Sequence, residues 1–240
     1  MIKKNGILYF EKFLEYPELV HGFSTRTFGS MRAMGMPESL KNFALRLRSG
    51  KNFDPQKFVR MNQVHSSNVR WVAEGSALGI DDTDGILSSE KDLFLSVITA
   101  DCVPILLYDP KKKFVGAVHA GWRGAYKEIV KHAVDEMIEK GSDPNDIIAG
   151  IGPCNRSCCY DIAQEHADMF RSKFPDCQDI LISRDEKVFL DLPKLVQYQL
   201  QSLGIPATNM EDAVICTYDS PEYLYSCRRE GAGFGEFVGI

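Results

Sequence analysis

The sequence lacks the long apolar runs of a membrane protein. None of its 240 residues falls in a stretch of about 18 apolar residues without a charge, the length that a membrane-spanning helix requires. Near the start, Glu11, Lys12 and Glu15 interrupt the apolar residues that an export signal would keep together. Internal repeats and low-complexity linkers are also missing. We therefore expect a cytoplasmic protein without a membrane segment, folded as a single domain over residues 1–240.

Positive charge is not in excess either. The chain has 28 basic and 33 acidic side chains, which give a formal net charge of −5. Nucleic acids and anionic membranes bind basic surfaces, so we expect neither as the main partner. A small-molecule partner remains, and the sequence indicates no particular oligomeric state.

The seven cysteines do not form the even number that a complete disulfide framework needs. A cytoplasmic chain of this length has no need of disulfides for its stability. We interpret these residues as free thiols, metal ligands or members of the core.

What is present is the composition of a globular protein, with 44% hydrophobic and 25% charged residues. Apolar periodicity predicts helices over residues 37–50, 124–141 and 191–204, with Asp191 as an N-cap and glycines at the ends. Short β-branched or aromatic runs predict strands over residues 57–72, 84–89, 93–100, 104–109, 113–120, 146–152 and 213–218. We expect an α+β (mixed α/β) fold, in which mixed β-sheets pack together with helices on the outside.

Three residues of metal-ligand type lie where predicted strands meet loops. Cys102 stands between two apolar strand signals, His65 follows "RMNQV", and His119 ends "FVGAV" before the glycine-flanked turn "AGWRG". Two imidazoles and one thiolate suit zinc and leave a fourth position open, as in catalytic sites. Asp101, next to Cys102, could orient an imidazole or act as a base.

The spacing of these three residues matches no short zinc motif, so other interpretations stay open. A buried cysteine and hydrogen-bonded histidines would be purely structural. Alternatively, Cys102 could be a nucleophile with His119 as its base, as in a cysteine hydrolase. His65 discriminates between the two kinds of site, because a dyad does not need it and a three-ligand metal site does.

The motifs "HGFSTR", "NQVH", "TADCVPILLYD", "AVHAGWRG", "IGPC…CCY" and "SCRRE" occur in this order between His21 and Arg229. In this respect the chain resembles the YfiH family, also called the laccase-domain or polyphenol oxidoreductase family. The resemblance implies a catalytic zinc bound by His65, Cys102 and His119. It also implies phosphorolysis of adenosine, inosine or methylthioadenosine, and hydrolytic deamination of adenosine.

The family also carries two other associations, which we keep as alternatives. One is the editing of peptidoglycan precursors, which a Cys–His hydrolase or amidase could perform. The other is copper-dependent polyphenol oxidation, in which Cu²⁺ would replace Zn²⁺. Laccase chemistry requires several coppers, and five histidines are too few to bind them.

A phosphorylase must hold phosphate beside the sugar. The predicted helix after "HAGWRG" offers backbone N–H donors and Arg123, and we take this as the candidate phosphate site. Arg26 and Arg228 are further candidates for binding an anion. The stretch "TFGSMRAMGMPESLKNF" after Arg26 is shorter than in the family and lacks its glycine-rich pattern, so the substrate preference could differ.

The remaining cysteines carry a weaker signal. Cys154, Cys158 and Cys159 could form a second metal site with His166 or Cys177, but their spacing fits no common zinc motif, and adjacent side chains on a strand or helix point apart. We therefore expect core packing or a tight turn there. Cys216 and Cys227 are expected to be small buried residues in strands.

Overall fold

A mixed β-sheet forms the centre of the fold. The computed structural model describes residues 1–32, 37–47, 54, 57–73, 75–76 and 79–240. Within them, the largest sheet has the strand order β13-β9-β7-β8-β5-β4. The inner pairs are antiparallel, and the outer pairs β13–β9 and β4–β5 are parallel. The strands comprise Met210–Asp212 (β13), Ile148–Ile151 (β9), Val103–Asp109 (β7), Phe114–Ala120 (β8), Gly85–Ser88 (β5) and Val69–Trp71 (β4).

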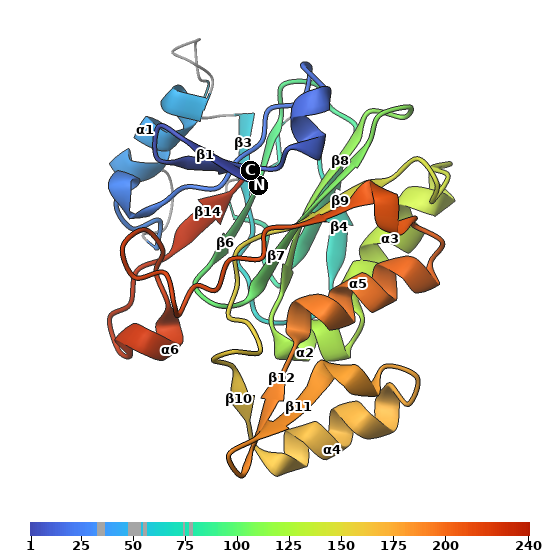
Figure 1. Ribbon diagram of the computed structural model, residues 1–240. Coiled ribbons are helices and arrows are strands. Elements are labelled where there is room, and N and C mark those ends of the chain that lie inside the picture. Colours follow the sequence, from blue (N-terminus) through green and yellow to red (C-terminus); the bar gives the residue numbers. More distant parts are fainter. Residues whose placement is uncertain (33–36, 48–53, 55–56, 74, 77–78) are drawn as a thin grey trace.

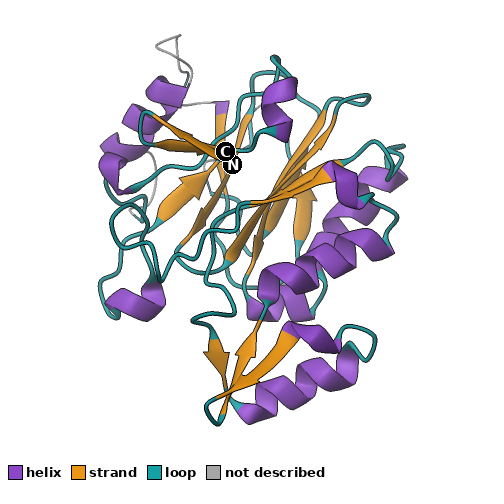
Figure 2. Cartoon of the chain, viewed as in Figure 1, coloured by secondary structure: helices purple, strands orange, loops and turns teal. Residues whose placement is uncertain are grey.

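Three helices cover one face of this sheet (Figures 1 and 2). They are α2 (Trp122–Tyr126), α3 (Ile129–Glu139) and α5 (Leu192–Ser202). Side chains alternate between the two faces of a strand, so Leu107 and Val118 pack with these helices while their neighbours Leu106 and Ala117 join the core on the other face. The central strands are therefore buried on both faces.

Smaller sheets complete the body. One contains β14 (Phe237–Gly239), β6 (Phe94–Thr99) and β3 (Phe58–Arg60), and a hairpin pairs β1 (Ile2–Lys4) with β2 (Ile7–Tyr9). Helix α1 (Glu38–Leu47) buries Leu40, Phe43 and Leu47 in the adjoining core. Short 3₁₀ turns comprise residues Lys12–Glu15, Arg26–Phe28, Gln178–Ile180 and Ala207–Asn209, and α6 comprises Cys227–Glu230.

A lobe extends from the body at the bottom of Figure 1. It contains the sheet β10-β12-β11, formed by Asp161–Ile162, Lys187–Leu190 and Leu181–Arg184, and helix α4 (Gln164–Lys173). Its first strand follows directly on the cysteine-rich turn at residues 157–159.

The structure confirms the α+β architecture and most of the predicted elements. The predicted strand over 57–72 is instead two short strands, β3 and β4, separated by the loop that contains His65. The predicted helix over residues 124–141 is wrong in one respect, because Glu128 has φ 61° and separates α2 from α3. The predicted strand over 213–218 contains only an isolated bridge at Cys216, since the strand lies earlier, at β13. Helix α4 was not predicted. The predicted helix end at Gly50 lies outside the described residues.

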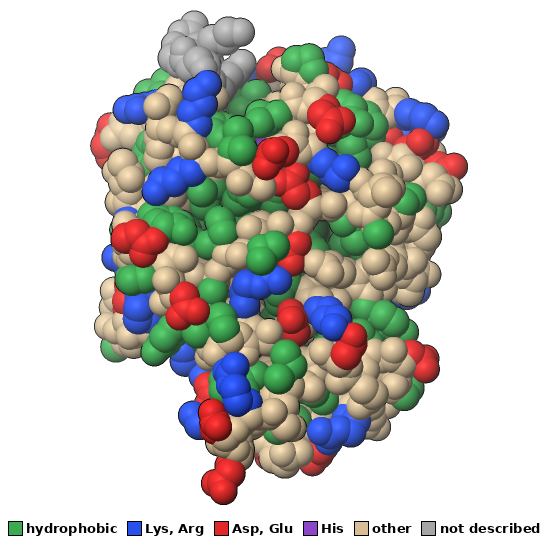
Figure 3. Space-filling model, in the orientation of Figure 1, with side chains coloured by type: hydrophobic (Ala, Val, Ile, Leu, Met, Phe, Trp, Pro, Cys, Tyr) green, Lys and Arg blue, Asp and Glu red, His purple; other side chains and the backbone are tan. Residues whose placement is uncertain are grey.

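In the part of the chain that the structure describes, no helix combines the length and the apolar character needed to cross a membrane. On the face shown in Figure 3, acidic and basic side chains are interspersed and do not form separate patches.

Candidate metal centre

The sheet topology brings His65, Cys102 and His119 together. His65 lies in the loop after β3, Cys102 lies in the turn between β6 and β7, and His119 lies near the end of β8. Strands β7 and β8 pair with Pro104 opposite His119, which places Cys102 beside the imidazole. The three potential ligand atoms all lie within 4.8 Å of one another, and Cys102 Sγ is 3.7 Å from His65 Nε2.

Asp84 organises the two histidines. It is buried just before β5, and its carboxylate accepts a hydrogen bond from His119 Nδ1 at 2.8 Å. The same carboxylate accepts backbone N–H bonds from Val64, His65 and Ser66 and a bond from the Ser66 hydroxyl. Because Nδ1 of His119 is occupied by Asp84, Nε2 is the nitrogen left to bind a metal.

The backbone at the site is tightly constrained. His65 and Asp101 have φ 59° and 103°, in the region that favours glycine, and the bonds from Asp84 hold the His65 loop in this conformation. Gly121 has no space for a side chain, because a Cβ there would lie 2.6 Å from His65 Cδ2 and 3.1 Å from Cys102 Sγ. The loop that begins α2 therefore closes directly against two of the three residues.

The electrostatics of the cluster favour a thiolate. Burial raises the pKa of Cys102, but the charge and hydrogen bonds of His119 and His65 outweigh it and bring the pKa down to about 6. Burial lowers the pKa of His119, whereas the charges of Cys102 and Asp84 raise it to about 9. A thiolate is the form of cysteine that binds metals and acts as a nucleophile.

The structure corrects the expectation that Asp101 orients an imidazole. Its two carboxylate oxygens accept hydrogen bonds from Thr217 Oγ1 at 2.6 Å and from the backbone N–H of Arg228 at 2.7 Å. Asp101 therefore connects the Cys102 turn to the segment that contains α6, and Asp84 makes the bond to the imidazole. Sequence patterns did not indicate Asp84, because its contact with His119 depends on the pairing of β5 with β8.

The three candidate arginines differ in their contacts. Arg26 pairs with Glu230, donates to the Leu224 carbonyl and stacks on Tyr225. Arg228 pairs with Asp161 at 2.6 Å. Arg123 is exposed and stacks on Trp122 at 4.4 Å, and no carboxylate within the described residues pairs with it.

The helix that begins at Trp122 has only five residues. It therefore adds little of the helix dipole that we expected to favour phosphate.

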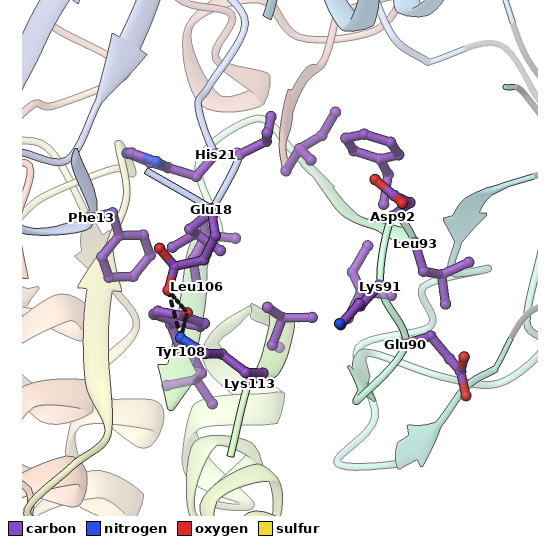
Figure 4. Close-up of a pocket in the computed structure, with 18 of the residues that line it drawn as sticks. Phe13, Glu18, His21, Glu90, Lys91, Asp92, Leu93, Leu106, Tyr108 and Lys113 are labelled. Carbon is purple, nitrogen blue, oxygen red and sulfur yellow. Dashed lines mark hydrogen bonds and ion pairs between the residues drawn. The ribbon is translucent and has the colours of Figure 1, made fainter. Parts of the chain in front are cut away.

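A pocket of about 250 Å³ lies between α2 and the lobe, and none of the three clustered residues lines it. Trp122 and Tyr160 line it, with His166 against Trp122 and Arg228 at its edge. Trp122 follows Gly121, which lies against His65 and Cys102, so the pocket and the cluster share this part of the chain. Burial and then the negative charge of Cys102 raise the pKa of Tyr160. A larger cavity of about 580 Å³ contains the Glu18–Tyr108–Lys113 network at the opposite end of β7 (Figure 4). None of the three clustered residues lines it.

The other cysteines match the predictions only in part. Cys154 and Cys216 are buried, whereas Cys227 is exposed at the start of α6 and is not in a strand. Cys158 and Cys159 lie in a turn, as predicted. Their side chains do not point apart, because a turn lacks the alternation of a strand and the two sulfurs are 3.4 Å from each other.

Comparison with known proteins gives consistent results. The chain is 32% identical over 241 residues to the mouse protein named purine nucleoside phosphorylase LACC1, covering 92% of this chain and 55% of the relative. It thus spans about half the length of that relative. It is 34% identical over 203 residues to purine nucleoside phosphorylase YlmD of Bacillus subtilis, covering 79% of this chain and 73% of that protein.

Solved structures with the same fold include YlmD from Geobacillus stearothermophilus. It has a TM-score of 0.85 at 25% identity and covers all of this chain and 96% of its own. The hypothetical protein YfiH of Bacillus licheniformis has a TM-score of 0.82 at 27% identity, over 91% of this chain and 90% of its own.

The family profile described as multi-copper polyphenol oxidoreductase laccase matches residues 21–240. The chain therefore belongs to this family, the laccase-domain or YfiH family that its motifs resemble.

Proposed function

We propose that the chain is a zinc-dependent enzyme that cleaves purine nucleosides by phosphorolysis. The observation that carries the proposal is the convergence of His65, Cys102 and His119 at the start of α2, where Trp122 lines an aromatic pocket and Arg123 pairs with no carboxylate of the described residues. The names of the mouse and Bacillus subtilis relatives, both purine nucleoside phosphorylases, support the same activity.

The donor set fits zinc. Two imidazole nitrogens and one thiolate leave a fourth position for a substrate, and Asp84 holds His119 in the tautomer that exposes Nε2. A bound zinc ion would act as a Lewis acid towards a substrate oxygen. Cu²⁺ is the weaker candidate. Laccase chemistry needs several coppers with histidine ligands, and the second group of possible metal ligands in the described residues (Cys158, Cys159, Cys216 and Asp219) contains no histidine.

The surrounding residues have separate roles in this proposal. Trp122 and Tyr160 form apolar walls on which a purine ring can stack. The raised pKa of Tyr160 keeps its phenol protonated, so that it can donate a hydrogen bond to the departing base.

Arg123 binds the attacking phosphate, and the Arg228–Asp161 pair holds the edge of the pocket. Through its bonds to Thr217 and Arg228, Asp101 has a positioning role. Arg26 holds α6 in place through its ion pair with Glu230.

In phosphorolysis, a phosphate oxygen forms a bond to the sugar C1′ and the bond from C1′ to the base breaks. We also propose hydrolytic deamination of adenosine, in which a water oxygen forms a bond to C6 of the base and the bond from C6 to the amino nitrogen breaks, which gives inosine and ammonia. We further place the enzyme in the cytoplasm, a proposal supported by the seven free cysteines.

Product analysis with adenosine tests these assignments. With phosphate present, we expect adenine and ribose 1-phosphate. Without phosphate, inosine alone would form by deamination. In Arg123→Ala, the KM for phosphate should rise about ten- to a hundredfold, because a charge-assisted contact is lost. Arg70→Ala, at an exposed arginine on β4, is the matched control. An unchanged phosphate KM in Arg123→Ala would contradict its assignment.

A second candidate function follows from the chain of interactions in which Cys102 contacts His119 and His119 contacts Asp84. Without a metal, these residues form a thiolate–imidazolium pair with a supporting carboxylate, the arrangement of a Cys–His hydrolase or amidase. Peptidoglycan precursors would then be substrates. In that case, alkylation of Cys102 would abolish the activity of metal-free protein, and His65→Ala would leave the activity largely intact.

A further inference from the structure

A second group of potential metal ligands lies outside the candidate catalytic centre. Cys158 and Cys159 come from the turn after β9, and Cys216 and Asp219 come from the loop between β13 and α6. The three sulfurs and one carboxylate oxygen all lie within 4.8 Å of one another. These residues have no part in the function proposed above.

The two segments are aligned by their backbones as well as by these side chains. Cys154 and Cys216 form a parallel bridge, in which the Cys154 N–H donates to Ile215 O and the Thr217 N–H donates to Cys154 O. In the turn, the N–H groups of Cys159 and Tyr160 both donate to Arg156 O. The four potential ligands are thus held by an ordered framework, which lowers the entropic cost of binding an ion.

The separations approach those of a tetrahedral zinc site. Zinc bonds of about 2.3 Å to sulfur and about 2.1 Å to oxygen give tetrahedral edges of about 3.8 Å between two sulfurs and about 3.6 Å between sulfur and oxygen. Here the sulfurs of Cys158 and Cys159 are 3.4 Å apart, and they lie 3.3 and 3.2 Å from the Asp219 oxygens. An ion at the centre requires shifts of a few tenths of an ångström along these edges, and the edges to Cys216 Sγ, which are within 4.8 Å, must close by at most about 1 Å.

The chemistry of the donors selects the ion. Three sulfurs disfavour Mg²⁺ and Ca²⁺, which prefer oxygen ligands, and favour zinc. Within the described residues, no lysine or arginine pairs with Asp219, so the cluster has no internal cation to offset its charge. Two guanidinium groups contact the backbone of these segments: Arg184 donates to the carbonyl of Cys158 at 2.8 Å, and Arg229 donates to the carbonyls of Thr217 and Tyr218 at 2.5 and 2.7 Å.

We propose that Cys158, Cys159, Cys216 and Asp219 bind a structural zinc ion that cross-links the 156–160 turn to the 216–220 loop. Four protein ligands close the coordination sphere, as in structural rather than catalytic sites.

The position of this ion gives it a second effect. Thr217, next to Cys216, bonds Asp101, and Tyr160, next to Cys159, lines the nucleoside pocket. The ion therefore fixes one wall of the pocket without contacting a substrate.

Metal counting on purified protein tests the proposal. Wild type should contain two zinc ions per chain. Cys102→Ala and Cys159→Ser should each retain one, and the double variant should contain none. Cys227→Ser, which replaces an exposed cysteine outside both clusters, should retain two. This pattern of zinc contents identifies the second site without any measurement of enzymatic activity. The second site can therefore be tested even if the proposed function is wrong.

X-ray absorption at the zinc edge of Cys102→Ala gives a test that leaves the second site unaltered. We expect three sulfurs at about 2.3 Å and one oxygen in the coordination shell. A metal-free Cys102→Ala protein would overturn the proposal, as would a shell rich in nitrogen. A disulfide among Cys158, Cys159 and Cys216, seen as fewer than seven free thiols in unfolded, chelator-treated wild type, would also overturn it.

Discussion

Replacing Asp84 by asparagine should separate the organisation of the metal centre from its ligands. One carboxylate oxygen accepts from His65 N at 3.0 Å and His119 Nδ1 at 2.8 Å, and the other accepts from Val64 N, Ser66 N and Ser66 Oγ. An amide has only one oxygen, so one set of donors must face an NH₂ group.

Both orientations of the amide are unfavourable. If the NH₂ group faces Ser66, the N–H groups of Val64 and Ser66, which lie in partly buried hydrogen bonds, lose their acceptor. If it faces His119, it donates to Nδ1, the imidazole proton moves to Nε2, and the nitrogen that should bind zinc is blocked. Loss of such a contact behind a ligand weakens metal binding by about 10- to 100-fold, and hydrogen bonds to a charged group are worth about 2 kcal/mol or more.

The assay has two parts. The zinc Kd of Asp84→Asn, measured by competition with a chelator, should rise about 10- to 100-fold. The free energy of unfolding of the metal-free protein in urea should fall by about 2–3 kcal/mol. Asp82→Asn, at an exposed aspartate two residues away, should change the free energy of unfolding by less than about 0.5 kcal/mol. A wild-type zinc Kd in Asp84→Asn would refute the reasoning.

Three further predictions follow from the structure. Burial lowers the pKa of His21 to about 4, so the unfolded state binds more protons and the free energy of unfolding should fall by about 3 kcal/mol between pH 6.5 and 4. Urea titrations at both pH values check this, and an identical pH dependence in His21→Gln would contradict it. Gly121→Ala should displace His65 and weaken zinc binding about tenfold or more, which chelator competition measures; an unchanged Kd would show that the loop can move. Asp191→Ala removes the N-cap contact to Lys194 N and should cost about 1 kcal/mol of stability in urea, whereas the phosphate KM should stay at the wild-type value.

The sequence predicted the central strands well because these depend on local signals. The N-cap at Asp191 is a similar case, since its side chain accepts from a residue three positions away. The family motifs added the metal ligand set, which the spacing alone did not favour over a structural interpretation.

The features that the sequence did not reveal depend on contacts between distant segments. Glu128 interrupts the predicted helix with a left-handed backbone, and its carboxylate pairs with Lys173 of α4. Asp84 meets His119 only when β5 and β8 pair. Cys216 and Asp219 meet the 158–159 turn only through the bridge between Cys154 and Cys216.

The most direct test of the proposed function is the rate of adenine release from adenosine and phosphate as a function of zinc bound at the His65–Cys102–His119 site. The account predicts that chelator-treated protein is inactive, that zinc restores the rate in wild type, and that zinc does not restore it in Cys102→Ala. Full activity in metal-free protein, stopped by alkylation of Cys102, would contradict the account and identify Cys102 as a nucleophile.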